Sequence, residues 1–131
     1  MTKIEIRKIT VKHILDESPD LSYLEQEYEE ETAENRATYK EQDKKRLDAY
    51  NNNQWCCIGI IANGEFLVPF DDHSGIIEHI SSGGLWGIES DTTAAEIKGT
   101  EEEQIAELKK IAGILNIYVS AHVEIEYKRN W

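Results

Sequence analysis

"WCCIGIIANGEF" (Trp55–Phe66) is the stretch that decides the fold of this 131-residue chain. Its first part, Trp55–Ala62, is a continuous apolar run of strand length, which is typical of the most buried strand of a sheet. Asn63-Gly64 follows, and this pair favours a type I′ turn because such a turn needs a positive φ at both positions. The stretch therefore predicts a hairpin whose second strand, Glu65–Phe70, returns antiparallel and lies at an edge or ends at Pro69.

Three further segments have the pattern of strands. Lys3–His13 alternates Ile and Val with charged residues, apart from one slip near Lys8 that indicates a β-bulge. Ile76–Ile80 predicts a strand that leads into a glycine-rich stretch. Tyr118–Tyr127 alternates again and predicts the last strand of the sheet.

Two long segments are predicted to be helices. Asn35–Tyr50 carries mixed charges and a thin apolar stripe, as expected for a largely solvated amphipathic helix. A second helix is indicated by apolar residues at helical spacing near the end of the chain. Its start is marked by one of two capping boxes, Thr93 with Glu96 or Thr100 with Glu103.

The order of these segments predicts one α+β domain over residues 1–131. Apolar residues make up 40% of the chain, which is enough for a core. The simplest arrangement is an antiparallel sheet of about five strands with two or three helices packed mainly on one face.

Composition restricts the partners of the chain. Its 14 Lys and Arg stand against 26 Asp and Glu, a formal net charge of −12. This charge opposes direct binding of nucleic acid and of anionic membranes, and it favours basic surfaces such as the clefts of nucleic-acid-binding proteins.

The sequence has no apolar run of membrane length and no signal-peptide pattern, so we expect a cytoplasmic location. Cys56 and Cys57 would point to opposite faces of a strand, so they are poorly placed to form a disulfide with each other. Two reduced thiols are therefore expected, as in a reducing compartment.

The segment Asp16–Glu34 has nine acidic residues and no Lys or Arg. Leu21, Leu24 and Tyr28 fall at helical spacing within it, so a short helix or ordered turn is expected there. Carboxylates arrayed on a helix would imitate the phosphate spacing of nucleic acid. The predicted partner-binding residues are Glu25, Glu27, Glu29, Glu30, Glu31 and Glu34.

The stretch Ile80–Asp91, ISSGGLWGIESD, contains three glycines, each of which costs roughly 0.5–1 kcal/mol relative to alanine inside a regular element. A corner of the sheet explains them: Gly83-Gly84 would kink the chain and Gly87 would allow close helix packing. Ser90 or Asp91 would then cap the next helix.

A small-ligand or catalytic site is the alternative interpretation of the same corner. It would lie beside His73 and His79, and its residues would be Gly83, Gly84, Trp86, Glu89 and Asp91. The polar residues at 71–73 and 78–79 lack the spacing of a zinc or calcium site, so we expect no metal and no cofactor. No nucleophile motif is present, so no catalytic residue is predicted.

Four stretches carry a resemblance to a known group of proteins: Asp20–Tyr28, Asn51–Phe66, Ser81–Asp91 and Glu102–Leu115. They resemble small phage, prophage and mobile-element proteins that have no assigned activity, and "SGGLWGIESD" is the most specific motif. The resemblance covers most of the chain between its first and last stretch. It implies a protein made inside a bacterial host, and it brings no catalytic residues. A glycine often follows "SYL" in that group, where this chain has Glu25.

These observations favour a protein that acts by binding. The leading hypothesis is an acidic phage or mobile-element accessory protein that inhibits a basic, nucleic-acid-binding host defence protein, as an anti-restriction or anti-CRISPR factor would. The small-ligand site at the glycine corner is the first alternative. A homo-oligomer that pairs through an open edge, either the strand with Pro69 or Tyr118–Tyr127, is the second. Trp131 is expected to be pinned on the surface or to contact a partner.

Overall fold

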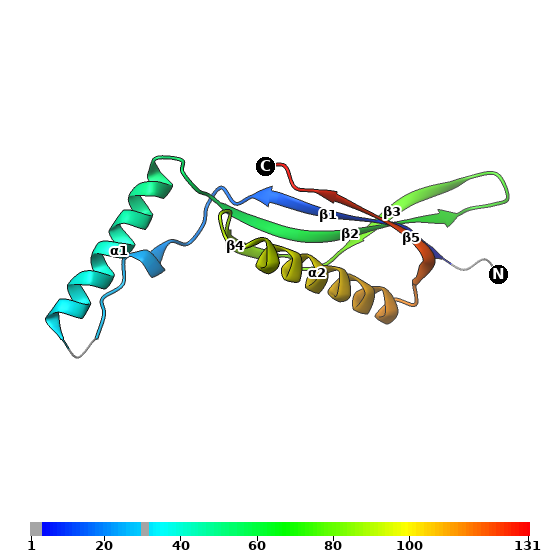
Figure 1. Ribbon diagram of the computed structural model, residues 1–131. Coiled ribbons are helices and arrows are strands. Elements are labelled where there is room, and N and C mark those ends of the chain that lie inside the picture. The colour runs from blue at the N-terminus through cyan, green and yellow to red at the C-terminus, as the bar shows by residue number, and fades with distance from the viewer. Residues whose placement is uncertain (1–3, 30–31) are drawn as a thin grey trace.

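The computed structural model describes residues 4–29 and 32–131, and Figure 1 shows a long sheet with one helix beneath it and another beyond its end. In chain order the elements are β1 (Glu5–Leu15), the 3-10 turn η1 (Ser22–Leu24), α1 (Ala33–Asn51), β2 (Cys57–Pro69), β3 (Gly75–Ser81), β4 (Leu85–Glu89), α2 (Ala94–Ile114) and β5 (Tyr118–Lys128). The predicted α+β class and the sheet of five strands are confirmed.

The sheet is mixed, so the prediction of a purely antiparallel sheet is wrong. Its strands are ordered β3-β2-β1-β5, and β4 also pairs with β2. Each neighbour of β2 runs antiparallel to it, whereas β5 runs parallel to β1. The parallel pair arises because α2 carries the chain from β4 across the sheet, and a helical crossover of this kind returns the next strand in the same direction. The strand with Pro69, β2, is therefore interior rather than an edge, but it ends at Pro69 as the sequence predicts, and β5 is an edge.

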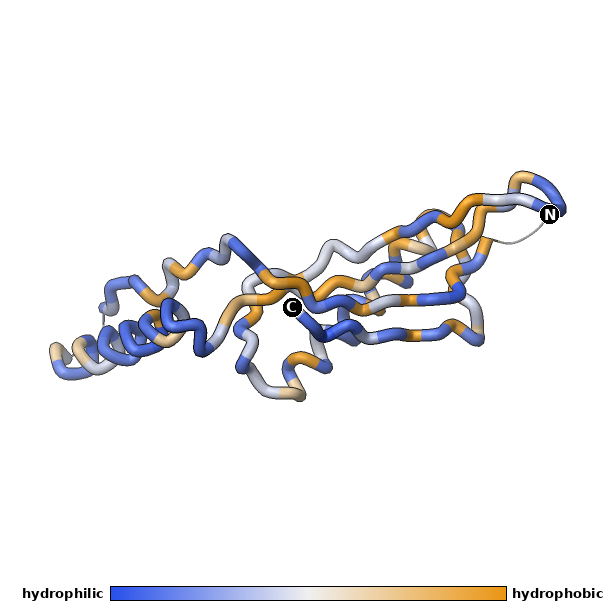
Figure 2. Tube along the Cα trace, turned by 90° about the horizontal axis from the view of Figure 1, so that it is seen from above, coloured by the Kyte–Doolittle hydropathy of each residue, from blue (hydrophilic) through white to orange (hydrophobic). Residues whose placement is uncertain are grey.

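The two helices lie in different places. α2 runs along one face of the sheet, whereas α1 lies beyond the end of the sheet, so only α2 follows the predicted packing (Figure 1). Figure 2 shows that α1 is hydrophilic along most of its length, which explains why it is not buried against the strands. The third helix allowed by the sequence, near Leu21–Tyr28, is only the turn η1, where Asp20 accepts the N–H of Ser22 at 3.0 Å.

β2 passes straight through Asn63-Gly64, so the predicted hairpin at this pair is wrong. Neither residue has a positive φ. A Cβ on Gly64 would lie 2.9 Å from Cδ1 of Ile6 and 3.3 Å from Cδ2 of Leu108. The glycine therefore allows β1 and α2 to approach β2 closely. The chain reverses later, where Asp71 accepts hydrogen bonds at the turn between β2 and β3.

The glycine stretch forms a kink between two strands that both pair with β2, as the corner interpretation predicts. β3 ends at Ser81, and Gly84 then takes a φ of 80° before β4 begins. Two side chains of α2 hold the kink: Glu107 accepts the N–H of Gly83 at 3.1 Å, and Gln104 accepts that of Gly84 at 3.0 Å.

The other details predicted for this stretch are wrong. Gly87 has a φ of 75°, and a Cβ built on it would meet nothing within 4 Å, so backbone conformation rather than helix packing favours glycine there. Thr93 caps α2 by accepting the N–H of Glu96 at 3.2 Å. Ser90 instead accepts the N–H of Cys56 at 2.9 Å.

The main core lies between α2 and the sheet. Its buried members are Ile6, Ile9, Val11, Ile58, Ile60, Ala62, Ile105, Leu108 and Ala112. A smaller cluster of Leu24, Trp55 and Cys57 packs under the inner side of α1. Cys56 packs against the first cluster and Cys57 belongs to the second, and both are free thiols, as predicted. None of the helices in the described ranges is long and apolar enough to cross a membrane.

One arginine joins α1 to the sheet. Arg46 donates to Asp91 at 2.6 Å and also lies 3.2 Å from Glu89, and its guanidinium sits 3.9 Å from the centroid of the Trp55 ring. Tyr23 of η1 donates its hydroxyl to Glu89 at 2.8 Å. The turn η1, helix α1 and the loop before α2 therefore meet at one ion-pair cluster.

Candidate functional site

A cavity of about 680 Å³ lies between the first half of α2, the end of β1 and the segment after β5. It is lined by His13, Ile58, Ser90, Ala94, Ile97, Lys98, Glu101, Glu102, Tyr127, Arg129 and Trp131. Its volume falls in the range of small-molecule sites, roughly 300–1,000 Å³. The ladder between β1 and β5 ends at Lys12 and Lys128, so β1 continues past the last residue of its neighbour. The cavity lies beside α2, at the end of β1 that β5 no longer covers.

Three charged or polar side chains meet in its wall. Glu101 projects from the sheet-facing side of α2 and is 2% exposed. Nε2 of His13, at the end of β1, lies 3.0 Å from Oε2 of Glu101. Arg129 donates from Nε to Oε2 and from Nη2 to Oε1, both at 2.9 Å, in the two-pronged geometry that matches a carboxylate.

The electrostatics of Glu101 favour its ionised form. Burial by itself would raise the pKa of this carboxyl, but hydrogen bonds from Arg129 and His13, together with their charges, outweigh burial and hold the pKa below its usual value. The pKa of Arg129 is raised by the same hydrogen bond. The guanidinium of Arg129 also lies 4.5 Å from the centroid of the Tyr127 ring. The carboxylate and the guanidinium neutralise each other in the wall.

The two ring nitrogens of His13 differ in their surroundings. The residue is 5% exposed, and its Nδ1 is buried without a hydrogen-bond partner among the described residues. Leaving a buried polar atom unpaired costs about 1–3 kcal/mol, so such atoms in native proteins call for a specific explanation. The ring of Trp131 lies nearly parallel to that of His13, with 6.3 Å between centroids and 20° between planes. The contact places Trp131 against the cavity.

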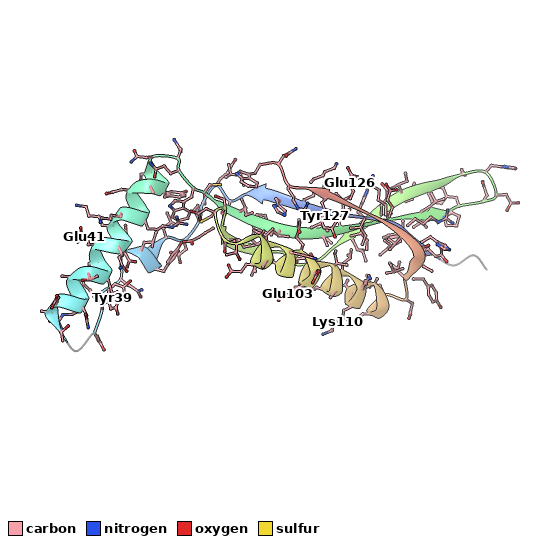
Figure 3. All side chains as sticks on the ribbon, viewed as in Figure 1. Tyr39, Glu41, Glu103, Lys110, Glu126 and Tyr127 are labelled. Atoms are coloured by element: carbon pink, nitrogen blue, oxygen red, sulfur yellow. The ribbon has the colours of Figure 1, made fainter. Side chains whose placement is uncertain are left out.

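The alternation of side chains along β5 and the orientation of α2 determine which side chains face the cavity. In Figure 3, Glu126 and Tyr127 lie on opposite faces of β5, and Glu103 and Lys110 project from α2 away from the sheet. Tyr127 therefore lines the cavity, whereas Glu126 pairs with Lys8 at 2.8 Å on the other face. The hydrogen bond to Lys8 lowers the pKa of Glu126.

The six predicted partner-binding glutamates lie away from this cavity. Glu25 follows η1, Glu27 pairs with Lys40 of α1, and Glu34 is in the first turn of α1. Glu29 is exposed, and Glu30 and Glu31 lie outside the described residues. The described acids are thus distributed over a turn, an irregular segment and a helix start, rather than arrayed on one helix as the mimicry argument assumed.

The structure does not bring the predicted glycine-corner residues together around one cavity. The N–H groups of Gly83 and Gly84 are hydrogen-bonded to α2, and Glu89 and Asp91 pair with Arg46. Arg46 also holds the pKa of the Asp91 carboxyl below its ordinary value. Trp86 lies over Gly59, where a Cβ would come within 2.2 Å of the ring.

The neighbours expected for this corner lie elsewhere along β2. Gly75, beside the turn with His73, pairs with Pro69, whereas Glu89 pairs with Cys57 near the other end of the same strand. His79 lies opposite Glu65, between these two ends. In residues 4–29 and 32–131 no group of three or more His, Cys, Asp or Glu side chains is arranged to hold a metal ion.

Sequence reasoning missed His13, Glu101 and Arg129, although two of them left a signal. His13 continues the alternation of Ile9 and Val11, which places a histidine on the buried face of a strand. Glu101 sits between Ile97 and Ile105 at helical spacing, which places a carboxylate inside an apolar stripe. Neither signal reveals Arg129, because that residue follows the last strand and its position depends on tertiary packing.

No protein family, no curated protein and no solved structure matches this chain.

Proposed function

We propose that the protein binds a small organic molecule in the cavity between α2 and the end of β1. The observation that carries this proposal is a cavity of ligand size whose wall holds the buried cluster of Glu101, Arg129 and His13. Small-molecule sites are typically concave and mainly apolar, with a few fixed polar groups that orient the ligand. Ile58, Ile97 and Trp131 supply the apolar walls, and Glu101 with Arg129 supplies the fixed polar groups.

The polar wall is preorganised. Arg129 fixes the Glu101 carboxylate, and that carboxylate accepts a hydrogen bond from Nε2 of His13, so the imidazole ring is held in one orientation before a ligand arrives. Because these side chains are already fixed, little ordering of the protein opposes binding. The small-ligand hypothesis therefore moves from the glycine corner to this cavity.

A fragment screen by ligand-observed NMR tests the proposal with a matched pair of variants. Ala94 lines the cavity at the start of α2, whereas the adjacent Ala95 does not line it, and both are exposed. Ala94→Trp should fill the cavity, while Ala95→Trp adds the same side chain outside it. We expect fragments that bind the wild type and Ala95→Trp, with affinity at least about tenfold weaker for Ala94→Trp. A screen in which no bound fragment distinguishes the two variants would falsify the proposal.

A second candidate function is binding of a basic protein partner through the acidic segment. Exposure of Glu25, Glu29 and Glu34 in a chain of net charge −12 supports it. In this candidate the protein is an accessory protein of a phage or mobile element that inhibits a nucleic-acid-binding host defence protein. Such a complex should form rapidly and weaken with salt, because exposed charges are screened.

The second candidate is tested with two variants of equal charge. One replaces the six glutamates of the acidic segment with glutamine. The control neutralises six acids that the structure places elsewhere on the surface: Glu41, Asp48, Asp72, Glu78, Glu103 and Glu124. A specific acidic site predicts that salt-sensitive binding to a basic protein is lost in the first variant and kept in the control. Equal loss in both would show that only net charge matters.

A further inference from the structure

The face of the sheet that α2 leaves open carries a ring platform beside two lysines. We infer that this face binds a nucleoside monophosphate, whose flat base stacks on Trp86 and whose phosphate lies between Lys12 and Lys128. The site is separate from the cavity, because its side chains project from the opposite face of the sheet. The inference depends on the orientation of one ring, on the surroundings of two lysines and on the spacing between them.

The open face has matched charges over most of its area. In Figure 1 no helix of the described ranges lies over the face of the sheet opposite α2. On this face His79 of β3 lies 3.5 Å from Glu65 of β2. Lys8 of β1 pairs with Glu126 of β5 at 2.8 Å. These acids and bases therefore already have partners within the chain.

Two lysines at the end of this face have no acidic partner. Lys12 follows the buried Val11 of β1, so it points away from α2, and the register of the sheet places it directly beside Lys128 of β5. Both side chains are exposed, and neither forms an ion pair with a described carboxylate. Like charges placed side by side repel each other. In a chain of net charge −12, an uncompensated pair of cations marks a place for an anion from outside the chain.

Trp86 lies flat on the same face. A Cβ on Gly59 would stand 2.2 Å from Cε3 of the ring and 2.5 and 2.6 Å from its ring neighbours Cζ3 and Cδ2. These similar distances place the Cβ above the plane of the ring, so a ring face and not a ring edge rests on Gly59. Ile58 and Ile60 are buried toward α2, so Gly59 has its open side on the opposite face. Trp86 is 48% exposed, and its other ring face is turned away from the sheet.

Two glycines make room for this ring. Besides Gly59, Gly84 lies against it, since a Cβ there would come 3.1 Å from Nε1 of Trp86. Among the described residues no aromatic ring or guanidinium stacks on the outer face of Trp86. A base can stack on such a face whatever its identity, because every base has a π-face. A ring that is already fixed in one orientation loses little freedom when a ligand stacks on it.

The spacing between the ring and the lysines fits a ligand with a sugar between base and phosphate. Gly59, beneath the ring, lies opposite Ile14 of β1, and Lys12 lies two residues before Ile14 on that strand. With about 3.3 Å per residue and about 4.8 Å between strands, the Cα of Lys12 lies about 8 Å from that of Gly59, and the Cα of Lys128 about 12 Å. A phosphate attached directly to the stacked ring would lie beside Ile14 and not between the two ammonium groups.

The acids of this face limit the size of the ligand. Glu65, Glu124 and Glu126 lie on the same face, and a nucleic-acid strand that continued beyond the two lysines would meet their charges. The net charge of the chain opposes a polyanion in the same way. A single nucleotide places its charge only on the lysine pair.

NMR titration of the full chain, read at the indole N–H signal of Trp86, tests the inference with three probes. Adenosine monophosphate has both the base and the phosphate, adenosine lacks the phosphate, and ribose phosphate lacks the base. We expect adenosine monophosphate to bind at least about tenfold more tightly than either of the others. Its affinity should fall as salt is added, because the lysines are exposed.

A matched pair of double variants tests the lysines. Lys12→Gln with Lys128→Gln removes the cation pair, whereas Lys109→Gln with Lys110→Gln removes the same charge from α2, where Lys110 projects away from the sheet (Figure 3). Affinity for adenosine monophosphate should weaken at least about fivefold in the first variant and change less than about twofold in the second. In Trp86→Ala, read at the ligand signals, the preference for adenosine monophosphate over ribose phosphate should disappear.

Each other outcome overturns a named part of the inference. Equal affinity for adenosine monophosphate and ribose phosphate overturns stacking on Trp86, and equal affinity for adenosine monophosphate and adenosine overturns the role of the lysines. Equal loss in the two double variants shows an effect of net charge alone. Tighter binding of a single-stranded oligonucleotide overturns the restriction to one nucleotide, and absence of binding overturns the site. Ala94→Trp should bind adenosine monophosphate as the wild type does, so the result is independent of the cavity.

Discussion

Nε2 of His13 lies 3.0 Å from Oε2 of Glu101, and this contact joins residues 88 positions apart in the chain. It links the end of β1 to the middle of α2 at a place where the neighbouring strand β5 has already ended. Arg129, which follows β5, completes the cluster from the third side. The same three side chains therefore fix the geometry of the cavity and contribute to the stability of the fold.

Replacing Glu101 should destabilise the protein. Glu101→Gln removes the charge that holds Arg129 and weakens the partner of the His13 Nε2–H, so the free energy of unfolding at pH 7 should fall by about 2 kcal/mol or more. Urea denaturation measures this change. Glu102→Gln, on the exposed side of the same turn, is the control and should change stability by less than about 0.5 kcal/mol. Equal effects of the two variants would contradict a specific role for the buried carboxylate.

The contribution of Glu101 should disappear in acid. Its pKa is lower in the folded protein than the ordinary value of about 4.3 in the unfolded chain. A carboxyl of this kind stabilises the fold above its unfolded pKa and loses that contribution as the pH falls through its folded pKa. The difference in unfolding free energy between wild type and Glu101→Gln should be full at pH 7 and shrink below about pH 4.5. A difference that stays constant down to pH 3 would exclude a lowered pKa of Glu101 in the folded protein.

Two glycine-to-alanine changes should act in opposite directions. A Cβ on Gly64 would press on Ile6 and Leu108 in the core, so Gly64→Ala should cost about 1–3 kcal/mol. Gly99 lies within α2, and a Cβ there would meet nothing within 4 Å. Gly99→Ala should therefore add about 0.5–1 kcal/mol of stability. Thermal and urea unfolding of the two variants give the signs, and a stabilising Gly64→Ala would show that the core has room at β2.

Removal of Arg46 should loosen α1 without disturbing the sheet. Arg46 holds the helix to Asp91 and Glu89, and few other side chains of α1 reach the body of the protein. Arg46 donates to both carboxylate oxygens of Asp91, and in Arg46→Lys this two-pronged contact is lost. Hydrogen exchange of the α1 amides should accelerate several-fold, while the amides of β1 and β2 keep their rates. Lys45→Ala changes a neighbouring exposed cation and should leave both sets of rates as they are in the wild type.

Sequence patterns correctly predicted features that depend on residues close together in the chain, such as the bulge in β1 and a capping box at the start of α2. The slip near Lys8 does mark a bulge, because the register shifts between Ile6 and Lys8 on both sides of β1. Of the two capping boxes, the one at Thr93 starts α2, whereas Thr100 lies inside the helix. Both boxes have the same local pattern, so the sequence around them does not decide between them.

The predictions that failed concern features that residues far apart in the chain determine. Asn63-Gly64 favours a turn in isolation, but the glycine is needed where Ile6 and Leu108 meet β2, so tertiary packing overrides the local preference. The direction of β5 could not be read from its alternation, which is the same in parallel and antiparallel pairs. The cavity depends on where the β1–β5 ladder stops, and no pattern within either strand encodes that position.

The short segment after β5 gives the cavity one wall that is not part of any strand ladder. Pairing between β1 and β5 ends at Lys12 and Lys128, so Trp131 can move without breaking a backbone hydrogen bond of the sheet, whereas Arg129 is held by the buried Glu101 carboxylate. For the proposed ligand, the barrier to exchange is then set by the side-chain contacts of Trp131 and not by opening of the core. Residence time of the proposed ligand and global stability are consequently separable at Trp131 but coupled at Arg129.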